Sequence, residues 1–152
     1  MGTAAVLPGS NGGEPAARLR RAAQADAPAL ATLYGCEVEQ MTSWLQTGSV
    51  LLVENGSRQP LAAVRWRPDR LGWRVEPIVT LPAEHGQAYG RWLMTKLEAM
   101  AIKGNVARLE MKLEDPGDEA YYRRLGYRSD GDQELLLSKR VGGVWQRQGT
   151  SS

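Results

Sequence analysis

The stretch VTLPAEHGQAYGRWLM, residues 79 to 94, decides the fold of this chain. It opens with apolar residues typical of a strand, passes Pro82, Gly86 and Gly90, and continues as an amphipathic sequence. This order predicts a strand, a turn and a helix that begins near Tyr89. Because the first N–H groups of a helix lack helical acceptors and converge at its start, the turn is a candidate pyrophosphate site.

A second stretch, EAYYRRLGY at residues 119 to 127, predicts a short helix that ends at Gly126 and returns to an extended segment at Tyr127. The helix carries two adjacent tyrosines. A phenol can protonate a departing thiolate, so this helix is a candidate for acid catalysis. The glycine turn alone is equally typical of an ordinary strand-to-helix connection, and it is the second stretch that favours a functional interpretation.

Together the two stretches resemble the cofactor loop and the tyrosine helix of the GNAT superfamily of N-acetyltransferases. The family's loop reads Arg or Gln, two residues, Gly, one residue, then Gly or Ala, and HGQAYG at residues 85 to 90 occupies this frame. His85 and Ala88 depart from the family's pattern. The second motif, Tyr122 followed by Leu-Gly-Tyr at residues 125 to 127, is the family's usual one.

The resemblance covers roughly residues 17 to 141 and implies the α/β GNAT fold. This fold has a mixed central sheet of about six or seven strands, splayed between strands 4 and 5 and flanked by about four helices. We therefore expect one GNAT domain at residues 17 to 141. Residues 1 to 16, which are rich in Gly, Ala and Pro, are predicted to be a flexible tail, and residues 142 to 152 a second tail.

Hydrophobic patterning and turn residues place the elements within this domain. Strands are predicted at residues 17–22, 49–54, 61–67, 73–81, 107–113 and 134–141, and helices at residues 26–34, 38–45, 89–104 and 119–126. Asp26, with Pro28 after it, is expected to cap the first helix. Pro77 cannot donate to a strand ladder, so the strand at 73–81 is expected to have an edge, an unpaired side or a bulge there, either at the splay or as an incidental feature.

The resemblance implies acetyl-CoA as cosubstrate. The pyrophosphate would lie on the backbone N–H groups of His85, Gly86, Gln87, Ala88, Tyr89, Gly90 and Arg91, with the helix dipole and the charge of Arg91 adding to the attraction. Ile78, Val79 and Thr80 would pair with the pantetheine arm and donate to the developing oxyanion. Asp115 stands where many members have an asparagine that contacts the cofactor, and its charge is a departure from that pattern.

For catalysis the resemblance implies Tyr122 as the acid and Glu76 as the candidate base. A thiol pKa near ~8.5 and a phenol pKa near ~10 make full proton transfer uphill by about 2 kcal/mol, so Tyr122 is expected mainly to hydrogen-bond the sulfur. The alternative for Tyr122 is a packed core aromatic. Glu76 alternatively forms an ion pair with Arg65 or Arg67, and Glu110 is a second candidate base.

The acceptor is expected to be a primary amine of a small molecule or a protein. VRWRPDRLGWR, residues 64 to 74, contains four arginines and two tryptophans; it suits an anionic acceptor or, alternatively, keeps an exposed hairpin soluble. A homodimer is compatible with the fold.

Two other interpretations remain for the whole chain. One is a non-catalytic GNAT-fold module that binds CoA or a protein partner, suggested by the departures at His85, Ala88 and Asp115. The other is a small α/β protein with an unrelated anion site, which requires both motifs to be coincidental.

Composition excludes several classes of protein. The 152 residues carry 19 basic and 17 acidic side chains, and a net charge of +2 is too balanced to indicate a nucleic-acid partner. The single cysteine, Cys36, excludes an internal disulfide, and one histidine without a cysteine cluster argues against a metal site. A chain without a disulfide fits a reducing compartment, so we expect a cytoplasmic protein. No apolar run approaches the ~20 residues that span a bilayer, so we expect no membrane partner.

Overall fold

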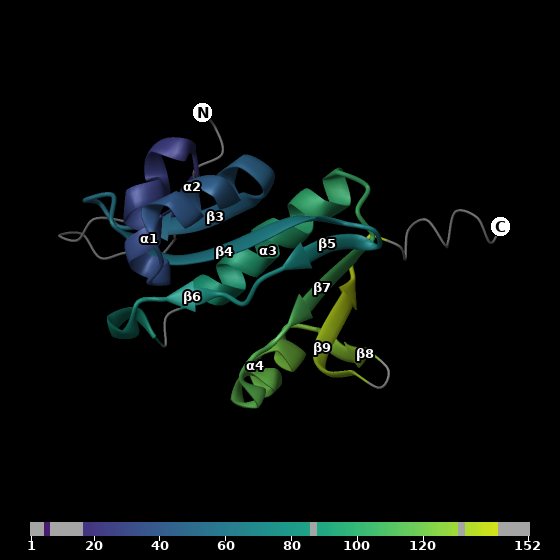
Figure 1. The fold of residues 1–152 in the computed structure, drawn as a ribbon. Coiled ribbons are helices and arrows are strands. Elements are labelled where there is room, and N and C mark those ends of the chain that lie inside the picture. The colour runs from purple at the N-terminus through teal and green to yellow at the C-terminus, as the bar shows by residue number, and fades with distance from the viewer. Residues whose placement is uncertain (1–4, 7–16, 86–87, 131–132, 143–152) are drawn as a thin grey trace. The chain divides into compact units, whose positions relative to one another are not determined.

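The computed structural model describes residues 5–6, 17–85, 88–130 and 133–142 (Figure 1). They form two compact units, each assembled from two segments of the chain. Met1–Arg65 with Ile78–Leu93 is the N-terminal unit, and Trp66–Pro77 with Met94–Ser152 is the C-terminal unit. Two elements, the strand β4 (Pro60–Asp69) and the helix α3 (Tyr89–Lys103), run from one unit into the other.

The N-terminal unit contains an antiparallel part of the sheet. Strand β2 (Arg18–Arg21) pairs with β3 (Ser49–Glu54), β3 neighbours β4, and the first half of β4 pairs with β6 (Val79–Thr80). The consecutive apolar residues of β3 are all buried, as expected for a strand covered on both faces. Strand β1 (Ala5–Val6) pairs with β2, so a short strand lies inside the segment predicted as a tail.

Two helices, α1 (Ala27–Tyr34) and α2 (Val38–Thr47), follow β2. Helix α1 ends at Gly35, whose φ of 69° is the left-handed conformation that glycine adopts without strain. Asp26 is the N-cap residue of α1, as predicted. Its side chain does not cap the helix, because it accepts no hydrogen bond from the N–H groups of the first turn. The Asp26 carboxylate instead accepts the N–H of Ala23 at 2.7 Å.

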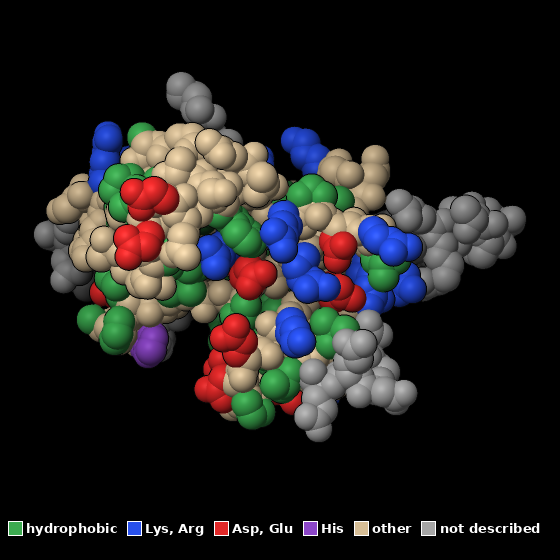
Figure 2. All heavy atoms as spheres, in the orientation of Figure 1, with side chains coloured by type: hydrophobic (Ala, Val, Ile, Leu, Met, Phe, Trp, Pro, Cys, Tyr) green, Lys and Arg blue, Asp and Glu red, His purple; other side chains and the backbone are tan. Residues whose placement is uncertain are grey.

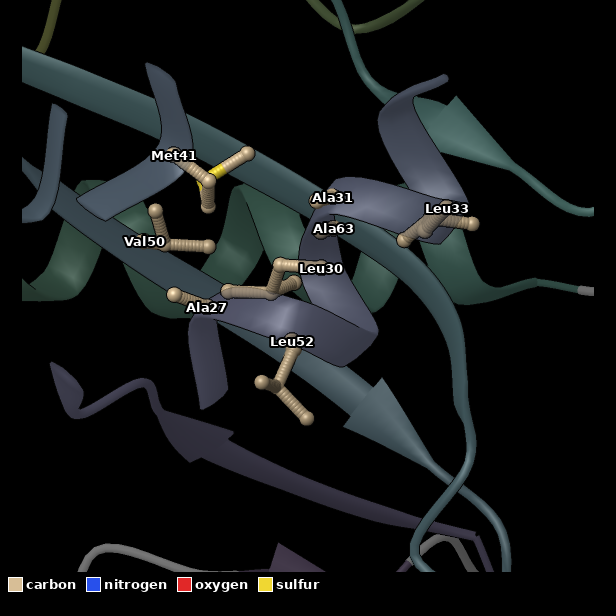
Figure 3. Packing of buried hydrophobic residues seen from close by; sticks show 8 residues of the cluster. All are labelled: Ala27, Leu30, Ala31, Leu33, Met41, Val50, Leu52 and Ala63. Atoms are coloured by element: carbon tan, nitrogen blue, oxygen red, sulfur yellow. The ribbon is translucent and has the colours of Figure 1, made fainter. Parts of the chain in front are cut away.

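The core of the N-terminal unit lies between these helices and the sheet (Figure 3). It consists of buried aliphatic side chains from α1, α2, β3 and β4, namely Ala27, Leu30, Ala31, Leu33, Met41, Val50, Leu52 and Ala63. Each fully buried Leu or Val contributes roughly 1.5–3 kcal/mol relative to an exposed one. This packing holds the two helices against β4, the strand that also pairs with β6.

The C-terminal unit contains the mixed part of the sheet. The end of β4 pairs antiparallel with β5 (Gly72–Val75), and β5 pairs parallel with β7 (Arg108–Lys112). Strand β9 (Gln133–Arg140) pairs antiparallel with β7 and with the unpredicted strand β8 (Arg128–Asp130). The short helices η3 (Pro116–Asp118) and α4 (Glu119–Arg124) connect β7 to β8.

The predicted strand at residues 73–81 is wrong as one element, because residues 76–78 interrupt it at Pro77 and divide it into β5 and β6. Parallel pairing with β7 ends at Val75, and β6 pairs with β4 and with no other strand among the described residues. This is the splay that the resemblance implies. The α/β fold with helices α1–α4 is confirmed, and the described residues have nine strands because β1, β8 and the divided strand add three.

Candidate active site

The predicted pyrophosphate loop lies in the N-terminal unit, between β6 and α3. After β6 the chain forms the single turn η2 (Pro82–Glu84). The Trp92 N–H donates to the carbonyl of Ala88 at 3.1 Å, which is the first bond of α3. The N–H groups of residues 88–91 precede that bond, and N–H groups in this position at a helix start are those that bind anions.

The predicted loop is not uniform along its length. The N–H of His85 donates to the carbonyl of Pro82 at 3.3 Å, so this amide belongs to η2 rather than to an anion cradle. Gly86 and Gln87 lie outside the described residues. The described part of the cradle therefore comprises Ala88 and the first three residues of α3.

The start of α3 has the electrostatics of an anion site. Its first turn contains no acidic residue, and Arg91 is exposed there. Tyr89 is buried, and the loss of solvent around its phenol, and then the neighbouring Glu84 carboxylate, raise the pKa of Tyr89. Tyr89 thus keeps its proton, and the positive end of the helix dipole is not opposed by a charge on α3 itself.

The predicted pantetheine stretch is partly a strand. Val79 and Thr80 form β6 and pair with Ala63 and Ala62 of β4. Ile78 precedes this strand, and all three residues from 78 to 80 are half-buried. Since β6 has a strand partner on one side only among the described residues, its other edge offers the backbone geometry that the prediction requires.

The tyrosine helix lies in the C-terminal unit. Tyr122 is buried at 3% exposure, and its ring meets Tyr121 and Tyr127 edge-to-face at centroid distances of 5.0 and 6.1 Å. The hydroxyl of Tyr127 donates to the sulfur of Met94 at 3.8 Å, and burial, then Glu98 and Tyr122, raise the pKa of Tyr127 far above its ordinary value. Tyr127 is therefore a core residue, whereas Tyr121 is exposed.

The two candidate bases differ in their surroundings. Glu76 is half-buried between β5 and β6, and no hydrogen bond or ion pair of its carboxylate occurs within the part of the chain that the structure describes. The alternative ion pair of Glu76 with Arg65 or Arg67 is therefore absent among the described residues, and the role of Glu76 as a base stays a prediction. The carboxylate of Glu110 accepts from Arg74 at 2.9 Å and from Arg108 at 3.4 Å. Intermixed basic and acidic side chains surround β5 and β7 in Figure 2, and Glu110 is part of this ionic network.

Asp115 has a local structural role. Its carboxylate accepts the N–H of Gly117 at 2.9 Å and caps η3. This bond accounts for an aspartate at a position where the family pattern has asparagine, since either residue can cap a turn. A contact from Asp115 to the cofactor stays a prediction.

The arginine-rich stretch at residues 64 to 74 contains side chains with different surroundings. Arg74 is held by Glu110 and lies 3.7 Å from Asp69, and the rings of Trp66 and Trp73 lie 5.3 Å apart. Arg65 instead lies over the rings of Tyr34 and Trp44 in the N-terminal unit. The sequence did not indicate this arrangement, because the two rings belong to distant segments.

No group of three or more His, Cys, Asp or Glu side chains that could hold a metal ion occurs in the described ranges. None of the helices in those ranges is long and apolar enough to cross a membrane.

The sheet divides after Val75, helix α3 begins after β6 along the chain, and α4 carries a buried tyrosine. These are the features of a GNAT-type acetyltransferase domain. A model of the Acetyltransferase (GNAT) family matches residues 18–127, and the chain belongs to this family. No curated protein sequence matches it.

Solved structures share the fold at low sequence identity. A GNAT family N-acetyltransferase from Escherichia coli in complex with CoA is 17% identical, with a TM-score of 0.70, over 88% of this chain and 85% of that one. The ribosomal-protein-S18-alanine N-acetyltransferase of E. coli is 14% identical, with a TM-score of 0.69, over 82% and 94% of the two chains. The PaiA N-acetyltransferase of Thermoplasma acidophilum, also in complex with coenzyme A, is 10% identical, with a TM-score of 0.63, over 82% and 98%.

Proposed function

We propose that this protein transfers the acetyl group of acetyl-CoA to a primary amine of a small molecule or protein, by direct attack in a ternary complex. The observation that carries the proposal is the start of α3, where the N–H groups of residues 88–91 precede the first helical bond and no acidic residue stands in the first turn. Membership of the GNAT family and the CoA complexes of two structural neighbours support it.

The donors at the start of α3 fit the pyrophosphate of CoA. Four converging N–H groups, the helix dipole and the guanidinium of Arg91 are the elements that bind a dianion at a helix start. The open edge of β6 suits the amide groups of the pantetheine arm, with Ile78, Val79 and Thr80 as its partners. These contacts use the backbone, so they tolerate the departures at His85 and Ala88.

In the proposed reaction the amine nitrogen attacks the thioester carbonyl, a C–N bond forms, the C–S bond breaks, and the sulfur receives a proton. Tyr122 hydrogen-bonds the departing sulfur. The amine must lose a proton, and a carboxylate with a pKa near ~4.3 facing an ammonium near ~10.4 is a weak base for it. Glu76 therefore acts through an intervening water.

Calorimetric titration tests the cradle. Acetyl-CoA, CoA and a longer acyl-CoA are titrated into the purified protein, and micromolar binding of acetyl-CoA is the expected result. Gly90→Glu places a carboxylate in the first turn of α3 and should abolish binding. Gly104→Glu, the same change at the other end of α3, is the control, since a Cβ at Gly104 meets only helix carbonyls at 3.4 Å or more.

Retained binding in a folded Gly90→Glu variant would refute this placement of the loop. The departures at His85 and Ala88 favour one second candidate, a non-catalytic module that binds CoA or a protein partner. Binding of acetyl-CoA without transfer to any amine in a panel of acceptors would support that candidate.

A further inference from the structure

Arg65 on β4 is held between two aromatic rings of the N-terminal unit. Its guanidinium carbon lies 4.5 Å from the ring centroid of Tyr34, the last residue of α1, and 4.3 Å from that of Trp44 on α2. Both distances are well within the roughly 6 Å range of a cation–π contact. The two helices thus fix the position of one positive charge on β4.

The rings do not complete the bonding of this guanidinium. Aromatic faces attract the charge, but the N–H donors of arginine lie in the guanidinium plane and require acceptors there. The Nε of Arg65 is buried without a hydrogen-bond partner, and its side chain makes no ion pair in the described ranges. Arg20 of the same unit shows the contrast, because it meets the carboxylates of Asp26 and Glu54 at 2.7 and 3.0 Å.

The place of Arg65 on β4 links it to the proposed cofactor stretch. Ala63 of β4 pairs with Val79 of β6 and belongs to the core under α1 and α2. Arg65 is two residues further along the strand, roughly 7 Å away and on the same face as Ala63. The backbone that carries this fixed cation therefore lies about 7 Å along β4 from the Ala63–Val79 pair.

We propose that Arg65, positioned by Tyr34 and Trp44, binds the carboxylate of the amine that accepts the acetyl group. The proposal rests on the acetyltransferase function proposed above and narrows its substrate to small amines that carry a carboxylate. A planar guanidinium with its faces covered presents its in-plane donors, which match the two oxygens of a carboxylate in a bidentate pair. One arginine also balances one carboxylate charge.

The test compares acceptors that differ in one group. An ω-amino carboxylate, its carboxamide and the corresponding aminoalkyl phosphonate are assayed with acetyl-CoA over a series of chain lengths. The wild-type protein should prefer the carboxylate over the carboxamide by about tenfold or more in kcat/KM. A preference for the phosphonate would show an anion site of different selectivity and overturn the assignment to carboxylates.

Variants of Arg65 provide the second part of the test. Arg65→Gln should raise KM for the carboxylate by about ten- to hundredfold, leave KM for the carboxamide unchanged and leave acetyl-CoA binding intact. Arg65→Lys keeps the positive charge but lacks the planar guanidinium, so its KM for the carboxylate should lie between those of the wild-type protein and Arg65→Gln. Arg18→Gln, which removes an exposed arginine from β2, is the matched control and should change neither KM.

Two measurements, acetyl-CoA binding and the turnover of carboxylate against carboxamide, distinguish a failure of this inference from a failure of the proposed function. If the wild-type protein does not bind acetyl-CoA, the proposed function is wrong, and the inference that rests on it is wrong as well. Acetyl-CoA binding with equal turnover of carboxylate and carboxamide would overturn the inference alone. Calorimetric titration of the amino carboxylate into the protein saturated with CoA needs no turnover, and its heat should disappear in Arg65→Gln.

Discussion

Two adjacent buried tyrosines of the C-terminal unit, Tyr122 and Tyr127, differ in what their hydroxyl groups can do. The hydroxyl of Tyr127 is used inside the core, on the sulfur of Met94, and its raised pKa keeps it protonated. We predict that Tyr122→Phe lowers kcat by about 10²-fold while the Kd of acetyl-CoA stays nearly constant, because only the proton donor is lost.

Tyr127→Phe is the matched control for this prediction. It removes a hydroxyl of equal size from the neighbouring ring and should cost only about 1 kcal/mol of stability, with kcat unchanged. Steady-state kinetics and calorimetry on both variants make the comparison. An unchanged kcat in Tyr122→Phe would remove Tyr122 from the mechanism.

Gly72, at the turn between β4 and β5, is required by a close approach of two backbones. Its φ is 153°, and a Cβ at this position would lie 2.0 Å from the carbonyl oxygen of Arg108 on β7. We predict that Gly72→Ala lowers the free energy of unfolding by at least about 2 kcal/mol, because strand β7 must shift. Urea denaturation measures the change, and Gly104→Ala, whose Cβ would meet helix carbonyls only at ordinary contact distances of 3.4 and 3.8 Å, should be nearly neutral or slightly stabilising.

Among the elements, β2, η1 (Gln24–Asp26) and β3 are joined by one ionic cluster. Arg20 of β2 binds Asp26 at 2.7 Å and the buried Glu54 of β3 at 3.0 Å. The hydrogen bonds from Arg20 lower the pKa of Asp26, although burial acts in the opposite direction. A lowered pKa means that the folded protein favours ionised Asp26.

The pH dependence follows from this direction. Because the folded-state pKa of Asp26 is below its unfolded value, its contribution to stability is complete above the ordinary carboxyl pKa near ~3.9 and is lost as pH falls through the folded value. We predict that Asp26→Asn lowers the free energy of unfolding by about 1–3 kcal/mol at pH 7, and that this difference shrinks below about pH 4. Urea titrations at several pH values test it, with the exposed Glu114→Gln as control. A difference that does not change with pH would contradict the assignment.

Helices and strands were predictable where the cue is local. Gly35 ends α1 and Pro77 interrupts the strand before the cofactor loop, and both residues act through their own backbone geometry. The division into β5 and β6 was not predictable in position, because it depends on which strand each half of residues 73–81 pairs with. Strand β8 was missed because its three polar residues have no apolar pattern to detect.

For the whole molecule, the sequence predicted the elements that carry the candidate site and missed the side-chain contacts that tertiary packing creates. The helix start at Tyr89 and the helix of Tyr122 are visible as short motifs, because glycines and a tyrosine at fixed spacing determine them. The Arg65 contacts join residues of α1, α2 and β4, and only tertiary packing brings these together. Asp26 shows the same limit, since Arg20 competes for the carboxylate that the local pattern assigned to the helix cap.

Ligand binding should stabilise the chain as one cooperative unit. Both compact units use two segments, and β4 and α3 pass from one to the other, so we expect a single unfolding transition. At about 100 times its Kd, acetyl-CoA should add about 2.7 kcal/mol, which corresponds to roughly 5–10 °C in Tm for a chain of this size. Acetyl-pantetheine lacks the pyrophosphate and should give a much smaller shift at the same concentration, because the start of α3 then has no anion to bind. Equal shifts for the two compounds in differential scanning calorimetry would mean that the helix start contributes nothing to binding.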